Sequence, residues 1–421
     1  MTQAPAAAPA DQAYRRDAAT WVAFAALFGF GIVYAMLGPV LPYLRQSEHI
    51  SYVVGALHQV GFAVGGITAG ILATRSSAPR RRTIAIGLAG AAAAGLLLGY
   101  GRILPVTIVA ALLVNVFATA ALIRMWALVA DLHPVHRTVA MSEGEVAVSF
   151  AGVLTPAVVS LCAATLVGWR FSFVVAFVVV VACAGAVGAT RLPDVGGPAR
   201  SEPRVRAARD ENDRRTQWRS LMTIFAIVAL EFALSFWAAS YLHDDVGIAR
   251  DTSVALVSAL YAANLVGRLV ASRLARRLPA PVLLRLSLAT ALVGLPFLLG
   301  AENIAVAVVG LAVTGMGIGG TFPLASSLHI AASHRTADQA LGQILTVAGV
   351  AQIVGPLAAG AVAQAAGLRL GLLVLPVLVL LAAATTTRAA DVTSRARSAV
   401  QPRTPAALVR WLPGRWVSRR R

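Results

Sequence analysis

Long apolar stretches separated by short polar segments make up most of this chain. A window of about 19 residues, the length used to detect membrane spans, is predominantly apolar at twelve places. Because a helix needs about 20 apolar residues to cross the hydrocarbon core of a bilayer, the pattern predicts an all-α integral membrane protein with twelve transmembrane helices. The first six predicted spans are residues 20–44, 51–73, 83–101, 104–130, 140–166 and 169–190.

A polar segment, residues 191–219, divides the predicted spans into two groups of six. It contains eight arginines, five acidic residues, proline and glycine, and no apolar run, which is typical of a linker. The second six predicted spans are residues 221–242, 252–272, 282–300, 304–328, 340–366 and 368–387. The predicted organisation is a cytoplasmic N-terminal tail (1–19), an N-terminal half (20–190), a cytoplasmic linker (191–219), a C-terminal half (220–387) and a basic cytoplasmic tail (388–421).

The distribution of arginine gives the orientation. Hydrophobic residues make up 58% of the chain and charged residues 13%, and all 36 basic residues are arginine. With both termini and the linker in the cytoplasm, 29 of these arginines lie in cytoplasmic segments and five in the opposite loops. The positive-inside rule therefore predicts a multi-pass protein of the inner (plasma) membrane with both termini cytoplasmic. The net charge of +18, which alone would suggest a nucleic-acid binder, reflects this topology, and no nucleic-acid partner is expected.

The residue types present exclude several classes of protein. A chain without lysine has no P-loop lysine, which excludes an ATP-driven pump that carries its own nucleotide-binding domain. The two cysteines, Cys162 and Cys183, lie in apolar runs and do not predict a disulfide framework. No His/Cys cluster has the spacing of metal ligands and no nucleophile motif is present. We therefore expect no metal, no cofactor and no enzymatic activity.

The two groups of six spans repeat each other weakly. At an offset of 198 residues, His136-Arg137-Thr138 recurs as His334-Arg335-Thr336, and Tyr43-Leu44 recurs as Tyr241-Leu242. Two parallel copies of six helices, related by an axis along the membrane normal, form one large class of transporters. The repeat thus predicts two related halves on either side of the linker.

Motifs at the ends of several spans carry a family resemblance. They are Gly38-Pro39-x-Leu41-Pro42, Gly70-x-x-x-Thr74-Arg75 followed by Arg80-Arg81-Arg82, Gly168-Trp169-Arg170, Gly267-Arg268, Gly315-x-Gly317-x-Gly319 and Gly355-Pro356. On these motifs the chain resembles the major facilitator superfamily of bacterial secondary transporters over residues 20–387. The resemblance implies alternating access to a central cavity lined by the first, fourth, seventh and tenth spans.

The chain departs from the family pattern at two informative positions. Thr74 stands where the loop signature usually has aspartate, and the fifth span has Pro156 without the Gly-Pro pair typical of drug antiporters. These departures leave the subgroup unassigned.

Ionisable residues inside spans are candidates for proton coupling, because charge is costly in the bilayer and marks transport pathways. Glu231 lies at the centre of the seventh predicted span, and removal of its carboxyl group from water favours the protonated form. His58 lies in the second span, and imidazole gains and loses a proton near neutral pH. Each side chain either carries protons or has only a structural role, in which it makes a polar contact with a neighbouring helix.

Arg124 and Glu145 lie at the same depth on the fourth and fifth spans, which predicts an ion pair that acts either as an inner gate or as a static strut. Glu145 is also a proton-coupling candidate. By position in the loop motifs, Arg75 and Arg268 are gating candidates. The prolines and glycine that bend the fifth and eleventh spans join this group: Pro156, Gly355 and Pro356.

Polar and aromatic residues on presumed cavity helices are candidates for substrate contact. Asn115 and Thr119 share one face of the fourth span, and Asn264 lies in the eighth; such groups either bind substrate or hold helices together. Tyr34, Phe236 and Trp237 supply aromatic surface, for which anchoring at the membrane interface is the alternative.

These features predict a proton-coupled secondary transporter of a small organic solute. The aromatic lining and the single central acid favour efflux of a hydrophobic or cationic compound. Proton-coupled uptake of a sugar or organic acid, and a non-transporting membrane sensor or scaffold, are the alternatives. The expected partners are the small-molecule substrate, protons and the lipid bilayer, and the expected state is a monomer.

Overall fold

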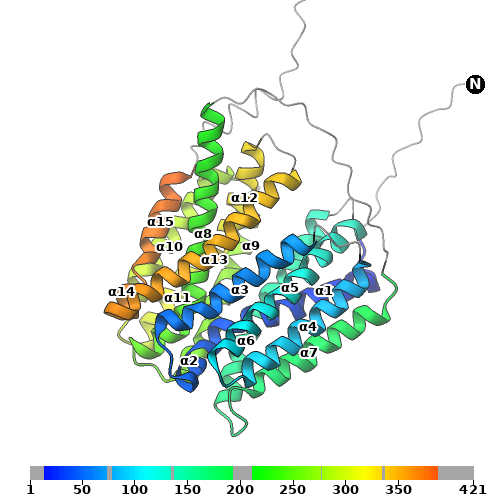
Figure 1. Cartoon of the computed structure of the whole chain (residues 1–421). Helices are drawn as coiled ribbons and strands as arrows, with labels where there is room; N and C mark the ends of the chain where they lie inside the picture. The colour runs from blue at the N-terminus through cyan, green and yellow to red at the C-terminus, as the bar shows by residue number, and fades with distance from the viewer. Residues whose placement is uncertain are drawn as a thin grey trace, which may run out of the picture.

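The fold consists of long helices throughout the part of the chain that the structure describes. This structure is a computed structural model, and it describes residues 14–73, 78–133, 137–192, 211–275, 277–333 and 337–386. Every element of secondary structure in these ranges is an α-helix (Figure 1). Twelve spans are long and apolar enough to cross a membrane. The predicted all-α fold with twelve transmembrane helices is therefore confirmed.

Fifteen helices make up the twelve spans. Nine spans are single helices, whereas the first, tenth and twelfth are each formed by two consecutive helices. The N-terminal half contains α1 (Ala18–Ala35), α2 (Leu37–Glu48), α3 (Tyr52–Ala73), α4 (Arg80–Tyr100), α5 (Leu104–Leu132), α6 (Arg137–Ala163) and α7 (Phe171–Ala189). The C-terminal half contains α8 (Glu211–Asp244), α9 (Arg250–Leu274), α10 (Ala280–Leu299), α11 (Ile304–Gly319), α12 (Thr321–Ala332), α13 (Ala337–Ala366), α14 (Leu368–Gly371) and α15 (Val374–Thr385).

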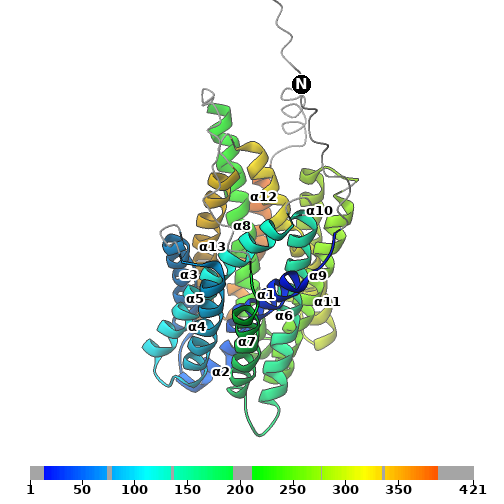
Figure 2. The same cartoon turned by 90° about the vertical axis from the view of Figure 1, so that its right-hand side faces the viewer.

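The helices form two bundles with the same internal arrangement (Figures 1 and 2). In the N-terminal bundle α5 packs against α3 and α4, and α1 packs against α6 and α7. In the C-terminal bundle the corresponding helices make the same pairs: α11 with α9 and α10, and α8 with α13 and α15. Contacts between the bundles are made mainly by α6 with α9 and by α3 with α13. We call the end of the molecule at which α1 and α8 begin the linker end, and the opposite end the far end.

Several helix ends follow directly from the sequence. Asp17 caps α1, because its side chain accepts hydrogen bonds from the backbone N–H and the hydroxyl group of Thr20 at 2.8 and 2.6 Å. These hydrogen bonds hold the pKa of Asp17 below its usual value. The first span is interrupted at Met36, shortly before Pro39, and the tenth is interrupted at Gly320, after a run of glycines.

The predicted linker is shorter than expected. The helix of the seventh span begins at Glu211, so residues 211–219 extend it beyond the apolar stretch. These residues contain neither proline nor glycine, the two residue types that most often end a helix. Residues 193–210 of the linker, Arg75 of the loop motif, and most of both predicted tails lie outside the described residues.

Glycine permits the closest approach of helices in the C-terminal bundle. At Gly267 of α9 an added Cβ would collide with the backbone carbonyl of Met316 on α11. At Gly319 of α11 it would collide with the backbone carbonyl of Asn264 on α9. Because backbone atoms cannot move aside cheaply, the two helices depend on each other's glycines.

Gly267→Val should therefore separate α9 from α11 and destabilise the protein, since overpacking costs about 1–3 kcal/mol. We expect the melting temperature of the purified protein in detergent to fall by several degrees. Gly185→Val on α7 is the matched control, because nothing lies within 4 Å of a Cβ there. Equal melting temperatures for the two variants would contradict the role of Gly267.

Candidate functional site

A group of polar side chains lies between the two halves, near the middle of α8. Glu231 is half-buried, and its Oε1 accepts a hydrogen bond from Nδ2 of Asn264 at 3.3 Å. Asn264 belongs to α9 and is 8% exposed. Arg268 lies one turn further along the same face of α9 and is close enough to attract the Glu231 carboxylate electrostatically.

Arg268 joins the two halves. Its Nη1 donates to Oε2 of Glu145 on α6 at 2.7 Å, and its Nε donates to the Gly319 backbone carbonyl at 3.3 Å. The side chains of Arg268 and Glu145 are 26% and 44% exposed, so water reaches the ion pair. Two carboxylates thus share one guanidinium group, and these three side chains carry one net negative charge when all are ionised.

Aromatic rings surround the same region. The ring of Tyr34 on α1 lies 5.3 Å from that of Phe62 on α3 and 6.1 Å from that of Phe232 on α8. Tyr34 is also within interaction range of Gln352 on α13. We call the set Tyr34, Glu145, Glu231, Tyr261, Asn264 and Arg268 the central cluster.

Tyr261 completes the central cluster from α9. Its ring touches the position of Gly152 on α6, and its hydroxyl group is within interaction range of Ser235 on α8. On α3, one turn before Phe62, Gln59 is 4% exposed, and its Nε2 has no hydrogen-bond partner in the described part of the chain. The centre of the molecule therefore combines a carboxylate, amide groups, phenol groups and apolar rings.

The ion pair of Glu145 differs from the predicted one. The sequence predicted Arg124 as its partner from equal depth, whereas the structure pairs Glu145 with Arg268. The physical reason is the direction of the helix faces: α6 packs mainly against α1 and α9, and much less against α5, which carries Arg124. Depth in the membrane is readable from sequence, but the face of a helix that meets a neighbour is not.

Asn115 and Thr119 lie outside the central cluster and hold two helices together. Asn115 is 2% exposed, and its Nδ2 donates to the Phe62 backbone carbonyl at 2.8 Å. Thr119 donates to Oδ1 of Asn115 at 2.9 Å. These bonds fasten α3 to α5, which is the helix-packing alternative for this pair.

Phe236 and Trp237 are buried in the packing between helices. Trp237 is fully buried, and its Nε1 donates to the Pro356 backbone carbonyl on α13 at 2.9 Å. Its ring meets the Tyr52 ring of α3 edge-on at 5.6 Å, so it contributes to the contact between the halves. At Gly355 an added Cβ would collide with the backbone of Ala229, which explains the close approach of α13 to α8. Pro156 is buried inside α6.

His58 is buried inside the N-terminal half. Its Nε2 lies 2.9 Å from the Thr107 hydroxyl group, and its Nδ1 lies 3.2 Å from the Gly55 backbone carbonyl. These partners belong to α3 itself and to α5, so the hydrogen bonds of His58 do not reach the central cluster.

The far end carries a set of contacts between the halves that the sequence did not predict. Arg45 of α2 pairs with Asp244 at 3.0 Å, and the hydroxyl group of Tyr52 donates to the same carboxylate at 2.9 Å. The hydroxyl group of Tyr43 donates to Asp251 at 2.5 Å, and the Arg250 guanidinium group donates to Gln46. Arg45 and Asp244 are 199 residues apart, so only the charges at the ends of the spans could have hinted at their pairing.

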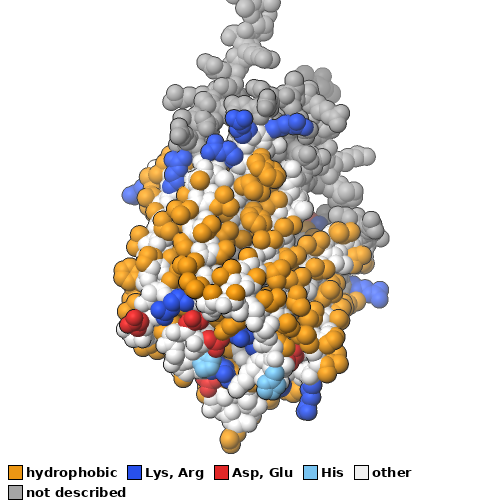
Figure 3. Space-filling view, turned by 60° about the vertical axis from the view of Figure 1, so that its left-hand side comes forward, with side chains coloured by type: hydrophobic (Ala, Val, Ile, Leu, Met, Phe, Trp, Pro, Cys, Tyr) orange, Lys and Arg blue, Asp and Glu red, His pale blue; other side chains and the backbone are white. Residues whose placement is uncertain are grey.

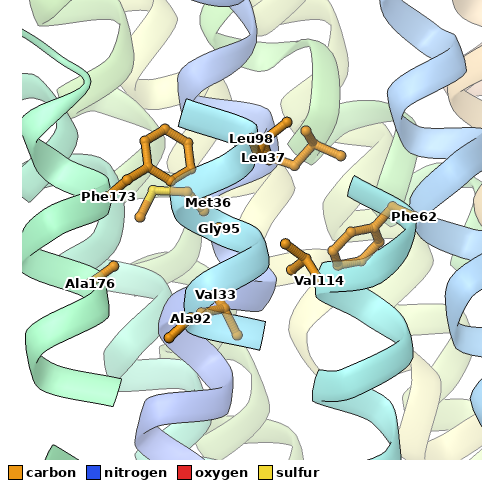
Figure 4. Close-up of a pocket in the computed structure, with 10 residues that line it drawn as sticks. All are labelled: Val33, Met36, Leu37, Phe62, Ala92, Gly95, Leu98, Val114, Phe173 and Ala176. Carbon is orange, nitrogen blue, oxygen red and sulfur yellow. The ribbon is translucent and has the colours of Figure 1, made fainter. Parts of the chain in front are cut away.

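A pocket lies inside the N-terminal half (Figure 4). No lining side chain offers a polar atom, so a polar solute would find no side-chain hydrogen-bond partner there. The pocket lies beside Met36, where the first span is interrupted. Its lining consists of Val33, Met36, Leu37, Phe62, Ala92, Gly95, Leu98, Val114, Phe173 and Ala176.

Comparison with known proteins decides the family. The sequence model of the Major Facilitator Superfamily matches residues 21–347. The chain belongs to this superfamily. It is a multi-pass membrane protein and a secondary transporter, as the motifs predicted. A curated relative from Sinorhizobium fredii, "Uncharacterized transporter y4wD", is 31% identical over 134 residues, which span 32% of this chain and 36% of the relative.

Solved structures of superfamily members share the fold. A bacterial homologue of the human lysosomal transporter Spinster, in an inward-facing and occupied conformation, has a TM-score of 0.71 at 13% identity, over 91% of this chain and 98% of that chain. The nucleoside transporter NupG has a TM-score of 0.69 at 12% identity, over 90% and 99%. A D-xylose–proton symporter has a TM-score of 0.66 at 14% identity, over 88% and 97%. At these identities the likeness concerns the fold alone.

The ion pair between α6 and α9 can be tested by charge reversal. Glu145→Arg and Arg268→Glu should each lower the melting temperature in detergent, because each places two like charges together. The double variant should recover most of the loss, with a coupling energy of about 1 kcal/mol. Glu145→Arg combined with Arg124→Glu is the matched control and should show no such recovery; recovery only with Arg124 would favour the pair predicted from depth.

Proposed function

We propose that this transporter exports a hydrophobic organic cation in exchange for protons, with Glu231 as the group that binds either one. The supporting observation is the imbalance of charge in the central cluster. The ion pair of Arg268 is made with Glu145, and the hydrogen bond to Glu231 comes from the neutral amide group of Asn264. Glu231 belongs to no ion pair of the described residues. A carboxylate within a span is costly unless something neutralises it.

The rings beside Glu231 suit the proposed substrate class. The Tyr34 ring lies within electrostatic range of the Glu231 carboxylate and packs against the Phe62 and Phe232 rings, and ring faces attract organic cations, particularly where water is scarce. A cation with apolar substituents would satisfy both the charge of Glu231 and the surrounding rings.

Exchange follows from the single unmatched carboxylate. One proton or one monovalent cation neutralises Glu231, and binding of either disfavours the other. A carrier that changes access only in the neutralised state would move the two in opposite directions. The halves would rock around the central cluster, with the far-end contacts broken in one state and the Arg268–Glu145 contact rearranged in the other.

We infer that the linker end faces the cytoplasm of a plasma membrane and that the protein works as a monomer. Figure 3 shows a broad hydrophobic surface, arginines near the linker end, and a mixture of acidic, histidine and arginine side chains at the far end. This distribution agrees with the positive-inside rule. The exposed apolar side chains, such as Leu161 at 67% and Val178 at 60%, suit contact with lipid.

A second candidate is proton-coupled uptake of a neutral hydroxylated solute such as a sugar. It is favoured by the amide groups of Asn264 and Gln352 and by the phenol groups of Tyr34 and Tyr261, which hydrogen-bond hydroxyl groups well. Under this reading Glu231 carries only the proton.

Glu231→Gln should abolish proton coupling, because glutamine cannot be protonated and cannot pair with a cation. The assay uses proteoliposomes with an imposed pH gradient, and a pH-sensitive dye reports the proton movement that follows addition of a panel of lipophilic cations. We expect at least a tenfold loss of the response, while Glu231→Asp retains part of it.

Glu302→Gln is the matched control, because Glu302 is an exposed acid in a far-end loop and should keep the wild-type response. An unchanged response in Glu231→Gln would remove Glu231 from the mechanism. A wild-type response to sugars but not to cations would replace the first candidate by the second.

A further inference from the structure

Arg250, at the start of α9, makes one of the contacts between the halves at the far end. Its Nη2 lies 3.0 Å from Nε2 of His243, which belongs to the same half. Its Nη1 donates to Oε1 of Gln46 on α2, in the other half. Its guanidinium carbon lies 5.8 Å from the centre of the Tyr43 ring, also on α2. The position of Arg250 is thus fixed by one acceptor in each half.

The hydrogen bonds fix the protonation state of His243. Arginine stays protonated in proteins and only donates hydrogen bonds, so Nε2 of His243 must be the acceptor. The other ring nitrogen, Nδ1, lies 2.9 Å from the Ile248 backbone carbonyl, which can only accept. The one proton of the imidazole therefore lies on Nδ1. The closed far end requires a neutral His243 in this single tautomer.

A second proton on His243 would be incompatible with this arrangement. It would direct an N–H group of the ring at an N–H group of Arg250 and bring two positive charges to about hydrogen-bond distance. His243 is half-buried at the end of α8, so water reaches the ring.

The three aspartates closest to His243 and Arg250 in the sequence are already engaged. Asp244 is held by Arg45 and Tyr52, and Asp251 accepts from Tyr43. Asp245 accepts a hydrogen bond from the backbone N–H of Arg369, whose guanidinium group donates to backbone carbonyls. Each of these aspartates would have to leave an existing partner before it could compensate the charge of a protonated His243.

We propose that His243 is a proton-binding site that releases the far end of the transporter. Protonation repels Arg250, removes its acceptor in the C-terminal half, and thereby breaks its hydrogen bond to Gln46. With Arg250 displaced, the contact of α2 with the start of α9 weakens and the far end opens. If an aspartate moves to the imidazolium ion instead, it leaves Arg45 or Tyr43 and weakens the same contact. This inference concerns the far end and stands independently of the role of Glu231.

The test is a distance measurement across the far end by pulsed electron paramagnetic resonance. Spin labels on Leu166→Cys and Glu302→Cys report the separation of the halves, since these exposed positions lie in far-end loops of different halves. Native Cys162 and Cys183 are replaced by alanine. Between about pH 8 and about pH 5.5, we expect the population with the longer distance to rise several-fold in the otherwise unchanged protein.

Three variants separate His243 from other titrating groups. His243→Gln keeps an acceptor for Arg250 without titrating, so its distances should not change with pH. His243→Lys is permanently cationic and should show the longer distance at both pH values. His49→Asn is the matched control, because His49 is an exposed far-end histidine and no hydrogen bond among the described residues joins it to Arg250; it should respond like the parent protein.

Two further variants cover the remaining outcomes. Arg250→Gln should open the far end at both pH values, which tests the arrangement even if a His243 variant does not fold. Glu231→Gln should keep the pH response, which separates this site from the central cluster. An acid-induced opening that persists in His243→Gln, or a closed far end in His243→Lys, would overturn the proposal.

Discussion

The exclusion of water from the bilayer is the constraint on which the rest of this structure depends. Without water, backbone N–H and C=O groups must be satisfied within the chain, and helices do so without needing a partner strand. The same constraint makes every charge inside a span expensive. The few that occur are therefore held close to partners: Arg268 with Glu145, and Glu231 with Asn264. In the central cluster, charged side chains lie within the spans despite the free-energy cost of removing them from water. That cost limits which ligands the cluster can bind.

The two halves share the same helix packing but differ in the charged side chains that they place at the centre. Helix pairs repeat, and so does a polar link between the first and fourth spans: Thr20 lies 2.7 Å from His133, and Ser220 lies 2.7 Å from His329. The charges do not repeat. At an offset of 198 residues, Glu231, Asn264 and Arg268 correspond to Val33, Gly66 and Gly70. The C-terminal half supplies most of the central charge, whereas the N-terminal half supplies rings, amide groups and the carboxylate of Glu145.

The sequence predicts the architecture better than the site. Apolar length alone locates the twelve spans, because the bilayer fixes that length. It does not locate the interruptions at Met36 and Gly320, which depend on local backbone geometry within a run that stays apolar. Nor does it find the start of α8 at Glu211, since a polar helix outside the membrane has no apolar pattern.

For the site, the depth of a residue in the membrane can be predicted from the sequence, but the direction in which its side chain points cannot. The sequence brings Glu231, Glu145, Arg268, Asn264 and Tyr34 forward as candidates, and the structure gathers them in one place. The sequence also predicts Asn115 and Trp237 as candidates, because they are polar or aromatic residues within spans. In the structure their side chains instead donate hydrogen bonds to the backbone of neighbouring helices. A far-end pair such as Tyr43 and Asp251 joins residues from different halves. This pairing depends on how the two bundles dock against each other, and the periodicity of apolar residues along the chain does not predict that docking.

The ratio of two carboxylates to one guanidinium group in the central cluster has an electrical consequence for the proposed exchange of a cation for a proton. A carrier whose only unmatched charge is one carboxylate crosses the membrane with the same net charge whether it holds a proton or a monovalent cation. The work done against the membrane potential, about 2.3 kcal/mol per elementary charge per 100 mV, is then equal in the two directions and cancels over a full cycle. Such an exchange draws on the pH gradient alone, and it continues in a cell whose membrane potential has collapsed.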